Sequence, residues 1–207
     1  MSSAEEIYSN TTRIRWLPDP RVAAYAAAIE ERVAQFSGHI LAQNFMEFVD
    51  PLMQRMIADC FRDAAAHEGV IWMLDAEQKN LHCACQLGPA STKLANFVQA
   101  LDTGISGMVL AMQQPFCENS LAANRASAST LEEKLGVIIC SRILVPFLIA
   151  GKVRGIVACY QTKPSLDASD PSGFAEDAVE EMSLLARVLG RLFDYKLLCA
   201  ATGVDEG

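Results

Sequence analysis

The sequence has few aromatic residues and few histidines. Only 7% of its 207 residues are Phe, Trp or Tyr, whereas 51% are hydrophobic, so Ala, Val, Ile, Leu and Met must pack most of the core. The three histidines, His39, His67 and His82, are scattered along the chain. His82 precedes Cys83 and Cys85, but this spacing does not close a zinc site. We therefore expect no metal.

A surplus of positive charge and a long apolar run are also missing. The formal net charge is −8, which argues against a nucleic-acid surface and against adsorption to anionic lipid. No apolar run approaches the roughly 18 residues of a membrane span. Residues 1–10 are polar and acidic, unlike a signal peptide. We expect a cytoplasmic protein with neither nucleic acid nor membrane as a partner.

Catalytic motifs are absent as well. The sequence has no G-x-x-x-x-G-K-S/T loop, no G-x-S-x-G elbow and no H-E-x-x-H helix, so it predicts no enzyme. Seven cysteines are present, and most lie inside apolar runs. Their odd number and their positions favour reduced core residues over a disulfide framework. They are Cys60, Cys83, Cys85, Cys117, Cys140, Cys159 and Cys199.

Long helices with apolar residues at every third or fourth position are predicted at both ends of the chain. Such spacing is typical of a seam between two helices, so we expect a homodimer formed by the terminal helices. The first seam comprises Val22, Ala26, Ile29, Val33, Phe36 and Ile40, and the second comprises Met182, Leu185, Leu189, Leu192, Lys196 and Cys199. The length suggests one domain with extensions: a flexible lead-in (1–19), a helical extension (20–44), the domain (45–198) and a frayed tail (199–207).

The middle of the chain alternates between helical and strand-like patterns. A helix over 51–67, with Leu52, Met56, Cys60 and Ala64 buried, is expected to end at Gly69. The strands are expected at 70–74, 81–87, 115–118, 140–149 and 153–161, with Leu81, Cys83 and Cys85 on one face of the second. Shorter helices are expected at 91–99 and 104–113 and from the capping box of Ser129 and Glu132 to Gly136. This order predicts an α+β fold: one mainly antiparallel sheet, with the terminal helices on one face and short helices and loops on the other.

Four clusters in this order resemble the GAF family over about residues 45–198. They are Gly69-Val-Ile-Trp-Met-Leu-Asp75, Gly104-Ile-Ser-Gly107-Met-Val, Ser141-Arg-Ile-Leu-Val-Pro146-Phe with Gly151 and Gly155-Ile-Val-Ala, and Phe174-Ala-Glu-Asp177 with Leu185-Ala186. The resemblance implies a ligand cavity between the non-helical face of the sheet and residues 104–140. It also implies dimers through the terminal helices.

Several side chains are candidates to line this cavity. Alternation along the strands places Trp72 on a face with Val70 and Leu74, and Tyr160 on a face with Ile156 and Ala158, where the two aromatic residues either line a cavity or fill the core. Arg142 interrupts an apolar strand, so it must reach solvent, pair with an acid or meet a ligand. The other candidates are Met108 and Met112 on the middle helix, Glu118, Asn119 and Arg125 in the covering loop, and Cys140.

The resulting function hypothesis is a GAF sensor or regulatory protein that binds an unknown small molecule and signals to a separate partner. One alternative is a GAF fold whose cavity has filled, leaving a dimerisation or scaffold module. Another is a thiol reductase, since one GAF subgroup reduces free methionine sulfoxide and both Cys117 and Cys140 border the expected cavity. However, that subgroup has its cysteine well upstream of the proline strand, whereas Cys140 lies six residues before Pro146. The signature of the cyclic-nucleotide subgroup is also absent.

Overall fold

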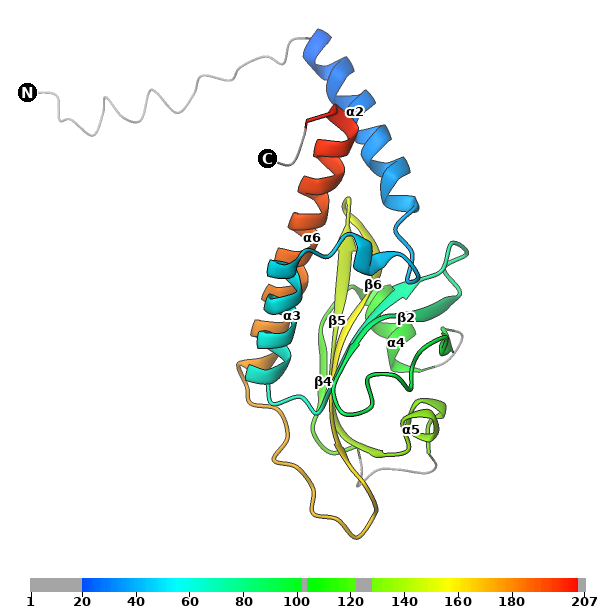
Figure 1. Cartoon of the computed structure of the whole chain (residues 1–207), viewed down its shortest axis with the longest axis vertical. Coiled ribbons are helices and arrows are strands. Elements are labelled where there is room, and N and C mark those ends of the chain that lie inside the picture. The colour runs from blue at the N-terminus through cyan, green and yellow to red at the C-terminus, as the bar shows by residue number, and fades with distance from the viewer. Residues whose placement is uncertain (1–19, 102–103, 122–127, 205–207) are drawn as a thin grey trace, which may run out of the picture.

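The computed structural model describes residues 20–101, 104–121 and 128–204, with side chains from residue 23 onward. It has an α+β architecture, as predicted (Figure 1). The helices are α2 (Pro20–Gly38), η1 (Phe45–Glu47), α3 (Pro51–Asp63), α4 (Ile105–Met112), α5 (Thr130–Leu135) and α6 (Ala178–Thr202). The strands are β1 (Glu68–Leu74), β2 (Asn80–Leu87), β3 (Val98–Ala100), β4 (Phe116–Glu118), β5 (Ile138–Ile149) and β6 (Lys152–Lys163).

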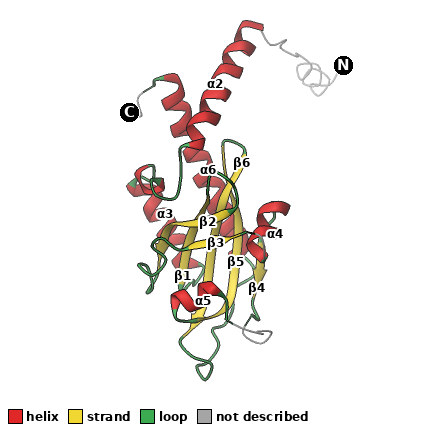
Figure 2. Cartoon of the chain, turned by 90° about the vertical axis from the view of Figure 1, so that its right-hand side faces the viewer, coloured by secondary structure: helices red, strands yellow, loops and turns green. Residues whose placement is uncertain are grey.

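The six strands form one sheet in the order β3-β2-β1-β6-β5-β4, and all neighbours are antiparallel. Helices α3 and α6 lie on one side of this sheet, and α4 and α5 lie on the other (Figure 1). Helices α2 and α6 extend together beyond one end of the sheet, as both views show (Figure 2). None of the described helices has the combination of length and apolarity that crossing a bilayer requires.

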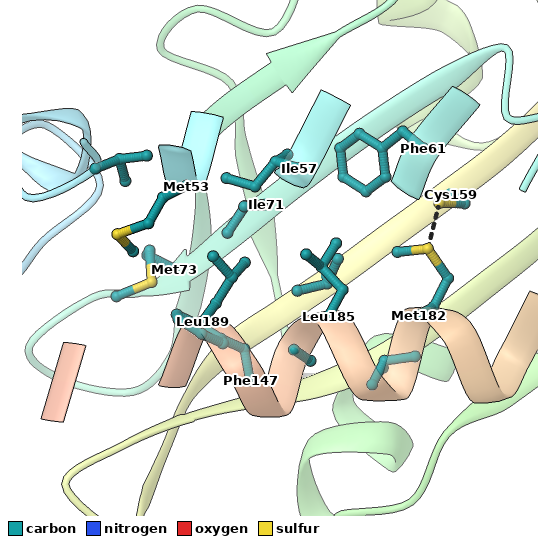
Figure 3. Close-up of a cluster of buried hydrophobic side chains, with 14 of the residues drawn as sticks. Met53, Ile57, Phe61, Ile71, Met73, Phe147, Cys159, Met182, Leu185 and Leu189 are labelled. Carbon is teal, nitrogen blue, oxygen red and sulfur yellow. Dashed lines mark hydrogen bonds between the residues drawn. The ribbon is translucent and has the colours of Figure 1, made fainter. Parts of the chain in front are cut away.

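Alternation along β1 divides the buried side chains into two cores, as the sequence predicted. Ile71 and Met73 belong to the helix-side core, which packs beneath α3 and α6 (Figure 3). Val70, Trp72 and Leu74 belong to the opposite-face core. Because every residue of β1 is buried, this strand passes through the centre of the molecule between the two cores.

The predicted buried stripe of α3 is confirmed only in part: Ala64 is buried, and Met56 and Cys60 are partly buried against the helix-side core. Leu52 is 66% exposed, whereas the side chains directed into the helix-side core are Met53, Ile57 and Phe61 (Figure 3). Both sets have helical spacing, and only packing against α6 and the sheet decides between them. The helix also ends earlier than predicted, at Asp63, and Gly69 instead lies in β1 with the Phe61 ring where its side chain would be.

Two further predictions fail between β1 and α4. A β-bulge shifts the register so that Ile71 pairs with Cys85 and Trp72 with Cys83. Cys83 therefore packs on the opposite-face core and Cys85 on the helix-side core, so the two thiols do not share a face. The predicted helix over 91–99 is replaced by turns that lead into β3.

The first half of the predicted seam of α6 faces the sheet. Met182, Leu185 and Leu189 are buried in the helix-side core (Figure 3). The helix also continues to Thr202, and both Cys199 and Ala201 are buried, so the start of the predicted frayed tail is ordered helix.

Candidate functional site

A cavity of about 580 Å³ opens on the face of the sheet that carries α4 and α5. Strands β5 and β6 form its floor, and β3 with the first turns of α4 and α5 forms its walls. Among the described residues, its lining comprises Phe97, Val98, Gln99, Ala100, Gly104, Ile105, Ser106, Ser129, Thr130, Leu131, Ile139, Arg142, Leu144 and Tyr160. This lining is largely apolar and carries one guanidinium, several hydroxyl groups and no carboxylate.

Strand pairing brings three polar side chains into a row across the sheet. Arg142 on β5 is the register partner of Glu118 on β4 and of Tyr160 on β6. The Arg142 Nη2 atom donates to the Glu118 Oε2 atom over 2.8 Å, and its guanidinium lies 5.6 Å from the centre of the Phe116 ring. Of the three environments open to this arginine, the structure shows pairing with an acid. Arg142 also lines the cavity.

Tyr160 presents a buried phenol to the cavity. The residue is only 4% exposed, and burial raises its pKa to about 12, with Trp72 and Arg142 opposing this shift. The Trp72 indole packs in the same core as Tyr160, and its ring centre lies 6.1 Å from that of the cavity residue Phe97. Its Nε1 atom makes no hydrogen bond of standard geometry to a described residue, although the indole is near enough to lower the pKa of the Tyr160 phenol. Trp72 therefore packs against residues that line the cavity but does not line the cavity itself.

Two walls of the cavity begin at helix starts. Gly104 caps α4 with a φ of 101° and no side-chain hydrogen bond, so its backbone lies open to the cavity in a conformation that suits glycine. The first turn of α5 is fixed by the predicted capping box, in which Glu132 N donates to Ser129 Oγ over 3.2 Å. Gln99 Nε2 donates to Ser106 Oγ over 3.1 Å and joins β3 to α4.

The comparisons with known proteins agree with this topology. No protein-family model and no curated protein matches the sequence. Solved structures do match it: the GAF-B domain of DevS from Mycobacterium smegmatis has a TM-score of 0.53 at 13% identity, and covers 75% of this chain and 100% of its own. This chain has the GAF fold.

Two other solved GAF domains lead to the same conclusion. The GAF domain of Acinetobacter phosphoenolpyruvate-protein phosphotransferase has a TM-score of 0.53 at 14% identity, over 88% of this chain and 97% of its own. The GAF domain/HD domain protein from Geobacter sulfurreducens has a TM-score of 0.51 at 16% identity, over 73% and 97%. At these identities the likeness establishes the GAF fold and no more, because the chemistry of a site depends on its own residues.

Three further predicted ligand residues, Met108, Met112 and Asn119, lie outside the cavity lining. Met108 and Met112 are 42% and 57% exposed on the outer face of α4, because the residues that this helix buries are Ser106 and Val109. The side-chain amide of Asn119 makes two hydrogen bonds to the backbone of Phe174. Neither methionine lines the cavity, and neither does Asn119. Arg125 lies outside the described residues.

Cys140 is buried at a bulge of β5, away from the cavity lining. Its Sγ atom lies 3.9 Å from the Asp170 carboxylate, and burial together with this carboxylate raises the pKa of the thiol. Burial, with Glu118 nearby, also raises the pKa of Cys117, the other cysteine of the reductase hypothesis. A nucleophilic cysteine needs a lowered pKa, so neither environment activates its thiol.

Several cavity residues of the GAF fold were not recognised as such in the sequence. The sequence predicts a helix at Gln99, and it marks Ser106 and Ser129 as residues of helix starts and Thr130 as no special residue. The one available signal was the motif that begins at Gly104, because a glycine at a helix start suits close approach of a ligand as well as close packing.

Proposed function

We propose that this chain is a homodimeric regulatory protein that binds a small molecule in the cavity and reports its presence to a separate protein partner. The observation that carries this proposal is a cavity of about 580 Å³ with an arginine and a buried tyrosine on its floor. Ligand sites are typically largely apolar cavities of this size with a few placed polar groups. The proposal contains no catalytic step.

The dimer part of the proposal rests on a different face of α6 from the one that the sequence suggested. Leu184, Val188, Tyr195 and Leu198 follow one another at intervals of 4, 7 and 3 residues, so they share one side of the helix. Leu184, Tyr195 and Leu198 are exposed. The exposed residue Arg191 lies on the same side, within the interval of seven residues, so the stripe is apolar apart from this arginine. Exposed apolar side chains with this spacing on a helix are typical of a surface that pairs with another helix.

Helix α2 supplies the second helix of the proposed interface. Its Val33 and Phe36 pack against the helix-side core, whereas Tyr25 is exposed nearer the start of α2. Since α2 and α6 extend together beyond the sheet (Figure 1), two copies of this helical pair would form a four-helix bundle. A ligand that favours one bundle arrangement over another would then signal through it.

Thermal shift against a panel of metabolites tests the binding part. A ligand at a hundred times its Kd should stabilise the protein by about 2.7 kcal/mol. Leu144→Trp, which places a large side chain at a cavity-lining position, should abolish this shift. The matched control is Leu148→Trp on the same strand, because Leu148 lines a groove against α6 instead. Equal shifts in both variants would show that the ligand binds elsewhere.

A further inference from the structure

Two polar contacts, made by neighbouring residues of the chain, link the cavity to the segment that leads into α6. The first is made by Arg142, which lines the cavity and pairs with Glu118 at the end of β4. The next residue in the chain is Asn119, whose side chain binds the backbone of Phe174. Phe174 is buried in the helix-side core, four residues before α6 begins.

The Asn119 side chain acts as a clamp between β4 and this segment. Its Nδ2 atom donates to the Phe174 carbonyl over 3.0 Å, and its Oδ1 atom accepts from the Phe174 N–H over 2.9 Å. Gly173 passes so close that a Cβ atom there would lie 3.0 Å from the Asn119 Cγ atom. These paired hydrogen bonds fix the distance between β4 and Phe174, so a displacement of β4 should also move the start of α6.

The ion pair between Arg142 and Glu118 can open so that Arg142 binds a different partner. The side chains of Arg142 and Glu118 are 25% and 31% exposed, so Glu118 can return to water at small cost. The Arg142 Nε atom is buried and has no hydrogen-bond partner among the described residues. A guanidinium with an unused donor favours a carboxylate or phosphate, which can accept two of its N–H groups at once.

Charge around the site supports an anion as the incoming group. The chain carries a net charge of −8, yet the described lining of the cavity has no Asp or Glu and only one charged side chain, Arg142. In addition, Tyr160 faces the cavity from the neighbouring strand, and its O–H is a hydrogen-bond donor for the same anion. A neutral ligand would leave this guanidinium without a better partner than Glu118.

We propose that the ligand is a small organic anion, carrying a carboxylate or a phosphate, which replaces Glu118 as the ion-pair partner of Arg142. Without this ion pair, β4 is held less firmly against β5, and the Asn119 clamp transmits the resulting displacement of β4 to the start of α6. The proposal rests on the proposed function for its ligand, but the two polar contacts exist in the protein without one. Arg142 is thus a specificity-determining residue, and Glu118 and Asn119 are positioning residues.

Calorimetric titration with matched pairs of probes tests the anion. Benzoate is compared with benzamide, and phenyl phosphate with phenol, so that a carboxylate and a phosphate are each separated from a neutral analogue of the same ring. The anionic member should bind at least about tenfold more tightly. Arg142→Met should remove this preference, Arg142→Lys should restore part of it, and Glu118→Gln should strengthen anion binding because the competing carboxylate is gone.

Hydrogen exchange tests the two polar contacts without any ligand. Glu118→Gln and Asn119→Ala should each accelerate amide exchange over residues 174–182 by about fivefold or more, while the amides of β1 stay protected. The control is Arg55→Gln, which removes a surface ion pair with Asp59 on α3 and should leave residues 174–182 unchanged. Unchanged exchange in both Glu118→Gln and Asn119→Ala would overturn the coupling.

The outcomes separate this proposal from the proposed function. If a metabolite binds in the cavity while neutral probes bind as well as anions, or Arg142→Met binds anions normally, the anion assignment is wrong and the sensor function stands. If neither the probes nor the metabolite panel binds, the sensor function and the anion assignment both fail. In that case the exchange of Glu118→Gln still decides whether the cavity wall and α6 are coupled.

Discussion

Gly155 is the residue at which a single added methyl group should damage the fold most directly. A Cβ atom at this position on β6 would overlap the carbonyl oxygen of Trp72 on β1. Both strands lie in the centre of the sheet and cannot separate without breaking their ladder. We expect Gly155→Ala to lower the free energy of unfolding by about 3 kcal/mol or more, measured by urea denaturation.

A second glycine provides the control for this variant. Gly38 ends α2 and has no heavy atom within 4 Å of its hypothetical Cβ atom. Gly38→Ala should leave stability unchanged or raise it by up to about 1 kcal/mol, because the unfolded chain loses freedom. If the two alanine variants were equally stable, the close approach of β6 to β1 would be wrong.

The thiols provide a second test at this scale. All seven cysteines are free, and Cys117 alone is exposed, while the others are partly or fully buried. One thiol per chain should therefore react quickly with an aromatic disulfide reagent, and Cys117→Ser should remove that phase. Because the pKa of Cys117 is raised, its thiolate fraction at neutral pH is small and the rate should climb steeply as the pH rises. Two or more fast thiols in the folded protein would contradict the burial described here.

At the scale of elements, α3 depends on its N-terminal cap. The Asp50 carboxylate accepts a hydrogen bond from Met53 N over 2.9 Å, and this bond, with Lys196 nearby, lowers its pKa. Asp50→Ala should cost about 1 kcal/mol at neutral pH. Asp50→Asn, which keeps an acceptor oxygen, should cost less.

The pH dependence of the same cap has a definite sign. A carboxyl group whose pKa is lowered by folding stabilises the fold above its unfolded pKa of about 3.9, and this contribution is lost as the pH falls through the folded pKa. The stability difference between wild type and Asp50→Asn should therefore shrink below about pH 4. A difference that stayed constant through the acid range would show that the ionised carboxylate does not act as the cap.

The elements that could be predicted from the sequence are those specified by local signals. The capping box at Ser129, the turn at Ala150-Gly151 and the alternation of β1 each determine structure within a few residues, and all three are present. The bulge opposite Ile71 and the rotation of α3 depend on packing against distant elements, so the placement of Cys85 and Leu52 could not be predicted locally.

The site residues, too, could be predicted only where a local signal in the sequence fixes their orientation. Arg142 and Tyr160 line the cavity because strand alternation fixes their face. Met108 and Met112 were placed there wrongly, since the rotation of an apolar helix is not encoded in its own periodicity when it has no polar face.

For the whole molecule, the dimer is the prediction that size measurements decide. Sedimentation velocity should give a dimer for the wild-type chain, and Tyr195→Glu or Leu198→Glu, which place a charge on the exposed stripe of α6, should give monomers. Leu166→Glu, at an exposed position in the loop after β6, should remain dimeric. A monomeric wild type, or dimers in all three variants, would exclude this stripe as the interface.

The central claim is that the cavity on the α4 and α5 face holds a small molecule against Arg142. A crystal structure of the protein with a ligand identified by thermal shift tests it most directly. We expect electron density for the ligand between the Arg142 guanidinium, the Tyr160 hydroxyl and the first turn of α4. Density at another place, such as the groove between β5 and α6, or a cavity filled by its own side chains, would contradict the account.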